Sequence, residues 1–530
     1  MGNEKDDYLM PDVSCPMPGL GKIMRSSLAV IVLSLSLAVA CQAGKPLEDD
    51  VRSPTFAGRF YPDSGPVLRL AVQKFMEDAV PARVKDPVAI IVPHAGYIYS
   101  GQICADGYRQ VSGRPYDTVV ILGTNHTNPG FRKISVFSGD GYRTPLGIAK
   151  VDKRMASALA ASDPDCVLED LLHVREHSVE VQVPFVQVLF PNARIVPVIV
   201  GIQDVEACVR FGRALAKVVQ GSRTLIVASS DLSHYPDAKD AVAVDGETLA
   251  AVVTLDAAVL HEKIKSLMDR HVPNLETCAC GEAPMMAAMT AAKALGATGG
   301  TVVSYLNSGD VPVGERTRVV GYAAVALAGG AEKPSLQRDE PSKTPAQVTL
   351  TPSEKKTLLA FARESISRYL ATRTIPLARG FDPRLQIHRG VFVTLWKKGE
   401  LRGCIGHVPA DTPLVNLVGA MALKSAFGDP RFYPLGDEEL AQVEIEISML
   451  TLPKIISGPA DILVGRDGVI LQKEGRAALF LPQVAPKEGW GRDETLDHLC
   501  LKAGLDKGCW KEGSQLSTFQ AIVFSESDFK

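Results

Sequence analysis

The sequence has no excess of positive charge, since 57 lysine and arginine residues and 60 aspartate and glutamate residues leave a formal net charge of −3. This balance argues against a protein that binds nucleic acid through its electrostatic field, and we expect no nucleic-acid partner. The sequence also lacks a Walker A loop, a dinucleotide-binding glycine motif and a G-x-S-x-G nucleophile motif. Its composition, with 46% hydrophobic and 6% aromatic residues, is typical of folded α/β proteins.

The ten cysteines form no C-x-x-C pair and show no zinc-ribbon spacing. Cys15 and Cys41 fall in an expected leader or at its end, which leaves eight others. Cys278 and Cys280 are the close pair, and outside the cytosol they could oxidise. We predict no disulfide framework from the rest.

The N-terminal region is typical of an exported protein. Lys22 and Arg25 precede an apolar run at 28–40 that is too short to span a membrane comfortably and ends at Cys41. Ala-Val-Ala-Cys at 38–41 resembles a bacterial lipobox, in which the cysteine is lipidated. We therefore expect a leader at 1–41, with Met24 as an alternative start, and a chain anchored by lipid at Cys41 on the periplasmic face of the envelope. The alternative is a soluble secreted or periplasmic chain.

Two breaks in composition divide the remaining chain. Residues 42–52 form a short tether, and residues 329–348 are rich in glycine, proline and charge, as in a linker. They separate a segment at 53–328 from a smaller one at 349–528.

The first segment alternates apolar runs with amphipathic stretches, which predicts an α/β layered sheet. The expected strands are 88–93, 118–122, 194–200, 224–228, 301–306 and 319–327. The expected helices are 64–79, 152–162, 179–190, 204–219, 238–252 and 282–295.

The second segment opens with a helix capped at 351–354, and strand-like runs follow at 390–396, 442–450 and 477–482. Because its strands and helices do not alternate regularly, we predict an α+β domain.

Polar side chains directly follow several predicted strands of the first segment. His94, His126, Asp231 and His234 each come just after an apolar run, and Cys280 precedes a predicted helix. Histidine and thiolate ligands suit a first-row transition metal, and loops at strand ends can converge on one cleft. A single such histidine is more often a loop or core residue, but the recurrence favours a metal site.

The motifs PHAGYIYSG, LGTNH, REHSVEVQVPF, SSDLSHY and CACG, in this order, resemble the Memo family over nearly the whole first segment. That family's fold resembles class III extradiol dioxygenases, which bind non-haem iron(II) through two histidines and a carboxylate. The resemblance implies metal ligands at His94, His126 and Cys280, with Asp231 and His234 as catalytic pocket residues. Cys280 stands where the dioxygenases have a glutamate. Iron(II) is the favoured metal, and copper or zinc are the alternatives.

Other pocket residues follow from the same motifs. His177 and Tyr97 are expected to line the pocket, and Glu180 is expected either to orient a ligand histidine or to cap a turn. His173 lies four residues before His177, a spacing that could place both on one helical face, but we expect His173 to be a solvated surface residue. Glu282 is expected to be a pocket or helix N-terminal charge rather than a ligand.

In the second segment, LRGCIGH, FGDPRFYPL and VEIEISML resemble the AMMECR family across about 350–528. The pattern at Arg402, Gly403, Cys404 and Gly406 suggests a tight turn that exposes N–H groups to an anion, with Arg402 as counter-charge. Cys404 could be a nucleophile if Arg402 or His407 lowers its pKa; a structural turn with a buried thiol is the alternative. Residues expected in the same cleft are Asp429, Arg431 and Glu446.

Two functions fit these features. The first is a metal-dependent, dioxygenase-like redox enzyme that acts on a small molecule, with His234 handling protons and Asp231 orienting it. The second is a non-catalytic module that binds metal or peptide at the envelope, using Tyr97, Tyr99 and Tyr235. Memo-like and AMMECR-like proteins also occur in the AmmeMemoRadiSam group, which implies a radical SAM partner and a shared process for the two domains.

Overall fold

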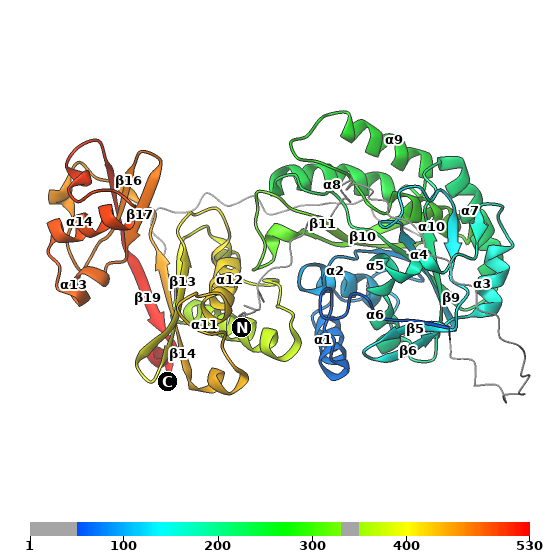
Figure 1. Cartoon of the computed structure of the whole chain (residues 1–530), viewed down its shortest axis with the longest axis horizontal. Helices are drawn as coiled ribbons and strands as arrows, with labels where there is room; N and C mark the ends of the chain where they lie inside the picture. Colours follow the sequence, from blue (N-terminus) through cyan, green and yellow to red (C-terminus); the bar gives the residue numbers. More distant parts are fainter. Residues whose placement is uncertain (1–49, 330–348) are drawn as a thin grey trace, which may run out of the picture.

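The computed structural model describes residues 50–329 and 349–530, which form two domains side by side (Figure 1). The expected leader, Cys41, most of the tether and most of the linker lie outside the described residues. None of the helices within these ranges has the length and apolar character needed to cross a bilayer.

The first domain is built on an eight-stranded sheet of order β10-β11-β2-β9-β3-β8-β4-β7. Its bounds are β2 (Ala89–Val92), β3 (Thr118–Thr124), β4 (Ile134–Val136), β7 (Cys166–Val167), β8 (Arg194–Val200), β9 (Thr224–Ser229), β10 (Gly299–Asn307) and β11 (Gly321–Ala328). The four central strands β2, β9, β3 and β8 run parallel, whereas β11 pairs antiparallel with β2 and β4 pairs antiparallel with β8. The α/β layered sheet is confirmed.

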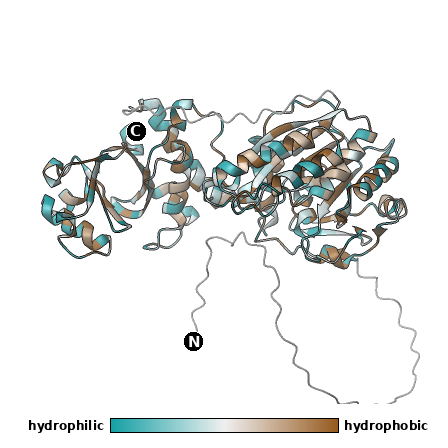
Figure 2. Cartoon of the chain, turned by 90° about the horizontal axis from the view of Figure 1, so that it is seen from above, coloured by the Kyte–Doolittle hydropathy of each residue, from teal (hydrophilic) through white to brown (hydrophobic). Residues whose placement is uncertain are grey.

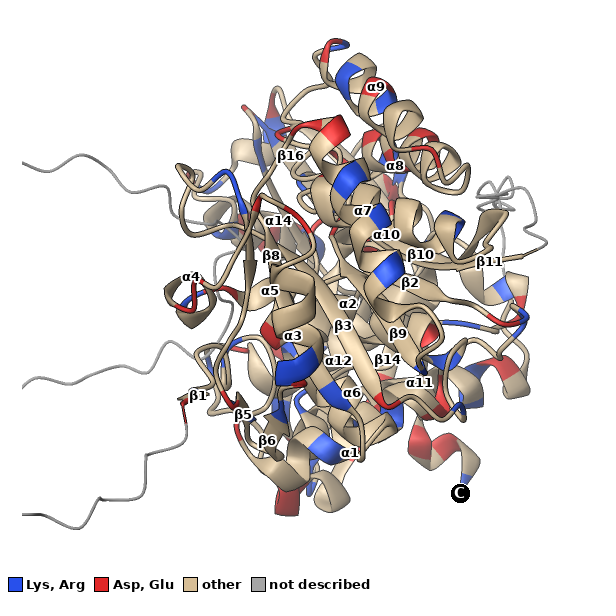
Figure 3. Ribbon diagram, turned by 90° about the vertical axis from the view of Figure 1, so that its right-hand side faces the viewer, with Lys and Arg blue, Asp and Glu red and all other residues tan. Residues whose placement is uncertain are grey.

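Helices cover both faces of this sheet, as Figure 3 shows end-on. On one face α10 (Glu282–Ala294) contacts β3 and β9, with α7 (Val205–Val219), α8 (Ala238–Val252) and α9 (Ala257–Met268) around it. On the other, α2 (Tyr97–Arg109) packs on β2, β10 and β11 beside α1 (Gly65–Glu77) and α6 (Val183–Leu189). The central strands are the brown, apolar layer of Figure 2.

The first domain also contains a small second sheet and three short helices. A three-stranded sheet joins β1 (Val51–Arg52), β5 (Gly141–Thr144) and β6 (Gly147–Lys150). The short helices are α3 (Lys153–Ala160), α4 (Leu171–Val174) and α5 (His177–Glu180).

The structure splits the helix expected at 179–190 and adds α2 and α9. Pro184 lies in the first turn of α6, where a missing N–H costs nothing, so a new helix begins there. The pattern of α2 gave no amphipathic signal because nearly its whole length is buried. A Cβ at its Gly107 would lie 2.4 Å from Val92 Cγ1, so glycine permits this close approach to β2.

The second domain contains two four-stranded sheets. One has the order β13-β12-β14-β19, with strands β12 (Val391–Lys397), β13 (Glu400–His407), β14 (Val443–Leu450) and β19 (Ala521–Ser525). The other has the order β15-β18-β16-β17, with strands β15 (Lys454–Ile455), β16 (Gly468–Lys473), β17 (Arg476–Phe480) and β18 (Gln515–Phe519). Its helices are α11 (Pro352–Thr372), α12 (Leu414–Phe427), α13 (Val484–Glu488) and α14 (Arg492–Lys502).

Helix α11 starts with the expected capping box between Thr351 and Glu354, and the α+β architecture is confirmed. Cys500 and Cys509 form a disulfide that the sequence did not predict, whereas Cys278 and Cys280 are both free thiols. The domains touch through α1 and α11. A second contact joins the loop after α11 to α2, where Arg379 Nη1 lies 2.8 Å from Oδ2 of the buried Asp106.

Candidate metal centre

Two histidines and one cysteine, residue types that commonly bind metal ions, lie together at the carboxyl edge of the parallel strands. His94 follows β2, His126 follows β3, and Cys280 lies just before α10. His94 Nε2 is 3.1 Å from Cys280 Sγ, and one donor atom from each of the three residues lies within 4.8 Å of the other two. The structure therefore brings together the three side chains that the sequence pointed to as ligands.

Serine and glutamine side chains orient the ring of His94, which is 1% exposed. Ser229 Oγ donates to Ser178 O at 2.6 Å, so its lone pairs accept from Gln182 Nε2 at 2.9 Å and from His94 Nδ1 at 3.1 Å. With Nδ1 held by Ser229 Oγ, Nε2 is the ring nitrogen that faces Cys280.

His126 is oriented by Glu176, a residue that the sequence analysis did not single out. Glu176 Oε1 accepts from His126 Nδ1 at 2.9 Å, and Oε2 accepts from the His126 backbone N–H at 2.8 Å. Although burial opposes both charges, the attraction between the two groups keeps the pKa of Glu176 low and raises that of His126. Glu176 therefore points His126 Nε2 towards Cys280.

The Cys280 thiol ionises easily for a buried group. Burial acts to raise its pKa, but the charge of His94 and hydrogen bonds from His126 and His94 outweigh it and lower the pKa to about 7. A thiolate is the form of cysteine that binds metals. Gly281 lets this loop pass close to β9, because a Cβ at this position would lie only 2.6 Å from Ser229 O.

Two nitrogen donors and one sulfur donor fit a first-row transition metal, and the three donor atoms lie within 4.8 Å of one another. His177 belongs to a second group with His126 and Glu176, and its ring stacks on that of His126 with centroids 4.5 Å apart. Burial and the neighbouring His126 charge lower the pKa of His177, so its neutral ring lines one side of the site.

The catalytic candidates Asp231 and His234 lie beside the cluster, but their roles differ from the expectation. Asp231 Oδ1 accepts from the backbone N–H groups of His94 and Ala95, at 2.7 and 3.3 Å, so it holds the His94 loop. The His234 ring is oriented by Leu232 O, 2.9 Å from its Nδ1, rather than by a hydrogen bond to the Asp231 carboxylate. Burial lowers the pKa of His234, which leaves its Nε2 as a neutral proton acceptor.

The structure contradicts the expectations for Tyr97 and His173 and, for Glu180, the first of its two alternatives. Glu180 contacts Arg52 and Tyr61 instead of a ligand histidine, and Tyr97 is a core residue that donates to Val181 O at 2.7 Å. His173 is fully buried rather than solvated, with Tyr142 Oη 2.6 Å from its Nδ1. His173 and His177 also lie on separate helices, α4 and α5, because the chain turns between them.

Glu282 is the first residue of α10 and pairs with His261 Nδ1 at 2.8 Å, as the expected helix N-terminal charge.

The buried His173 predicts a pH-dependent stability. Burial and the Arg52 guanidinium lower its pKa to about 3, whereas the unfolded chain takes up this proton below pH of about 6.5. The folded state therefore loses stability as the pH falls through that window. Between pH 6.5 and 5, wild type should lose about 2 kcal/mol more unfolding free energy than His173→Gln, as measured by urea titration. Equal losses in both chains would contradict this assignment.

In the second domain, the LRGCIGH motif is the edge strand β13 and not a tight turn. Arg402 is bound to Glu439 and to Tyr433 O, so it is not a counter-charge for an anion. Burial raises the pKa of Cys404, and Thr394 Oγ1 donates to its Sγ at 3.3 Å. These contacts favour the buried thiol over the nucleophile.

The other residues expected around Cys404 do gather there. Asp429 accepts from the Cys404 backbone N–H at 2.9 Å, and Arg431 donates to the Cys404 carbonyl at 3.1 Å. Glu446 pairs with Thr394 across β12 and β14, and it lines a groove with Trp396. Gly403 and Gly406 serve close packing, because a Cβ at Gly403 would lie 2.1 Å from Ser425 O.

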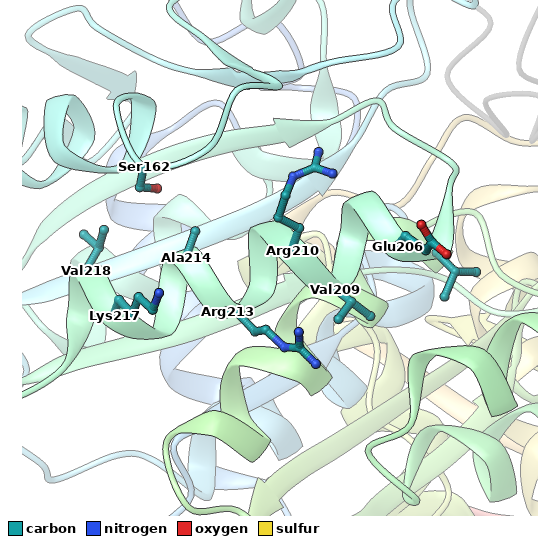
Figure 4. A pocket seen from close by; sticks show the side chains of 9 residues that line it. Ser162, Glu206, Val209, Arg210, Arg213, Ala214, Lys217 and Val218 are labelled. Carbon is teal, nitrogen blue, oxygen red and sulfur yellow. The ribbon is translucent and has the colours of Figure 1, made fainter.

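A separate groove of about 670 Å³ runs along α7 (Figure 4). Arg210, Arg213 and Lys217 lie along it between small apolar side chains. Arg210 is already paired with Asp163 at 3.0 Å, and the groove contains neither histidine nor cysteine. This groove therefore offers no imidazole or thiol donor for a metal ion.

The fold and the cluster define a layered α/β domain with two histidines and one cysteine at the carboxyl edge of its parallel central strands. The family described as "Memo-like protein" matches residues 52–326, and the family "AMMECR1" matches residues 359–524. The chain belongs to the Memo-like family and carries an AMMECR1 domain after the Memo-like domain.

Individual relatives match about half of this chain or a smaller part of it. A MEMO1 family protein of Methanosarcina barkeri is 37% identical over 280 residues, which are 52% of this chain and 100% of the relative. One from Aquifex aeolicus is 36% identical over 276 residues, 51% of this chain and 97% of the relative. The solved structure of an uncharacterized protein, PH0010 from Pyrococcus horikoshii, is 39% identical and covers 32% of this chain and 90% of its own, with a TM-score of 0.31.

Proposed function

We propose that the first domain is a metal-dependent redox enzyme of dioxygenase-like type that acts on a small oxidisable molecule. The observation that carries this proposal is the convergence of His94 Nε2, His126 Nε2 and Cys280 Sγ, with both imidazole tautomers fixed by hydrogen bonds. Iron(II) is the favoured metal, and copper or zinc also suit a donor set of two imidazoles and one thiolate. A redox metal in this position supplies Lewis acidity and electron transfer, with oxygen as a co-substrate.

The chain's own residues divide the remaining work. His234 accepts and returns a proton through Nε2, since its Nδ1 is bound to Leu232 O. Asp231 keeps the His94 backbone in place, and Glu176 keeps His126 in the ligand tautomer. His177 and the Phe60 ring, with centroids 4.9 Å apart, exclude water from one side.

The test is metal content after anaerobic purification. Wild type should hold close to one metal ion per chain, and His94→Ala and Cys280→Ala should each hold at least about tenfold less. His261→Ala is the matched control, because His261 is bound to Glu282 outside the cluster. If wild type also stays empty when iron(II), copper(I) and zinc are offered, the metalloenzyme proposal is wrong.

Turnover separates the enzyme from a metal-binding or peptide-binding module. Catechol-like compounds with oxygen form the first screen, and His234→Gln should keep its metal while it loses turnover. Metal binding without turnover, together with saturable binding of a peptide, would support the module instead. Tyr97 does not favour a peptide cleft, because its ring is 3% exposed.

We also propose that the chain is lipid-anchored at Cys41 on the periplasmic face of the bacterial envelope, with a soluble periplasmic or secreted chain as the alternative. Cys41→Ser should move the protein out of the membrane fraction and remove the lipid mass from the intact chain. We likewise propose that the chain has a radical SAM partner and that its two domains act in one process. Co-purification tests these proposals.

A further inference from the structure

Three large apolar side chains are exposed together on and before the short helix α4. Leu171 is 81% exposed, Leu168 is 54% exposed, and Val174 is 46% exposed. Leu171 and Val174 open and close the single turn of α4, so they lie on one side of it, and Leu168 lies three residues before this helix. Soluble proteins expose single apolar residues freely, but a group of this kind marks a contact surface.

This group, which we call the α4 patch, lies where the described chain begins. Arg52 donates from Nη2 to Val174 O at 3.2 Å and from Nε to His173 O at 2.5 Å. Thr55 Oγ1 also donates to Val174 O, at 2.8 Å. Figure 3 accordingly shows α4 and β1 at the same margin of the domain.

Cys41 lies only nine residues before Asp50, the first described residue. Nine residues span at most about 30 Å when fully extended, and about 17 Å as a flexible chain. A lipid on Cys41 therefore keeps β1, and the α4 patch bound to it, within reach of the bilayer surface.

We propose that the α4 patch docks on the lipid surface, with Leu168, Leu171 and Val174 inserted at the boundary between headgroups and acyl chains. This inference rests on the proposed lipid anchor at Cys41. Stable membrane attachment of a lipidated protein commonly needs a second contact, and a small apolar surface supplies one. The exposed Arg175, which closes α4, faces the headgroups.

A second copy of the chain is a less suitable partner for the α4 patch than the lipid surface. Three side chains provide far less contact than the roughly 1,200 Å² that a stable interface buries. The insertion of leucine side chains into lipid needs no such area, because each buried side chain contributes independently.

A tryptophan placed in the α4 patch tests the docking. The native Trp396, Trp490 and Trp510 all lie in the second domain, so their emission is subtracted with the wild-type chain. The full lipidated chain with Leu171→Trp is reconstituted into phosphatidylcholine vesicles with brominated acyl chains. The added emission should fall at least about twofold, as expected for a side chain inserted 5–10 Å into the boundary.

The matched control is Val259→Trp, since Val259 is 45% exposed on α9 in the same domain. Equal quenching at both positions, with lipid on Cys41 confirmed by mass, would overturn the docking and leave the anchor intact. If Cys41 carries no lipid, the proposed anchor is wrong, and the docking that rests on it is wrong as well. Blue-shifted Leu171→Trp emission without vesicles, with twice the chain mass in light scattering, would show that a second copy covers the patch and overturn the proposal.

Discussion

Replacing Glu180 with glutamine should lower the unfolding free energy of the first domain by about 3–5 kcal/mol. Glu180 is buried and forms an ion pair with Arg52 Nη1 at 2.5 Å, and their side chains are 0% and 2% exposed. It also accepts from Tyr61 Oη at 2.5 Å and from the backbone N–H groups of Thr55 and Phe56. The substitution leaves the guanidinium buried without its counter-charge, and urea unfolding followed by circular dichroism measures the loss.

An exposed ion pair of the same type provides the control. Asp117 pairs with Arg223, and both side chains are 61% exposed. Asp117→Asn should lower the unfolding free energy far less than Glu180→Gln does, because water solvates either charge when its partner is gone. If Glu180→Gln were as mild as this control, Glu180 would not be the residue that ties the start of the domain to α4 and α5.

The layered sheet could be predicted because parallel strands buried on both faces appear as uninterrupted apolar runs. The runs at 194–200 and 224–228 match β8 and β9 to within one residue. Helix α2 could not be predicted in this way, since burial on nearly all sides removes the amphipathic period.

The positions of the two candidate histidine ligands could be predicted for a related reason. His94 and His126 follow parallel strands, whose carboxyl ends share one edge of the sheet. The partners of these ligands could not, because Glu176 is 50 residues away from His126 in sequence and only the fold brings them together. Local spacing pointed to Glu180 instead, which lies one helical turn further on.

The glycines of the second domain misled the sequence analysis in a different way. Gly403 and Gly406 suggested a turn, yet both lie in a strand with negative φ. The absence of a side chain there makes room for a neighbouring group and does not serve to bend the chain. A Cβ at Gly406 would lie 2.2 Å from the Phe392 ring. Sequence alone does not distinguish a glycine needed for conformation from one needed for space.

Glu176→Gln should weaken metal binding by about 10–100-fold while the domain stays folded. The carboxylate of Glu176 holds His126 through both its Nδ1–H and its backbone N–H, and it also accepts from Ser178 N at 2.8 Å. Glutamine has one oxygen acceptor instead of two and no charge, so it cannot satisfy both contacts with His126 or make its ring as basic. Anaerobic titration with iron(II) and with zinc, against a chelator of known affinity, measures the change.

Glu282→Gln is the matched control, because Glu282 lies two residues from Cys280 but pairs with His261 and not with a ligand. Its metal affinity should stay within about threefold of wild type, since the orientation of the ligands is unchanged. Equal loss in both variants would mean that the general negative charge near the site, rather than the hydrogen bond from His126 to Glu176, sets the affinity. Loss in Glu176→Gln alone would show that a residue outside the coordinating set decides which nitrogen His126 presents.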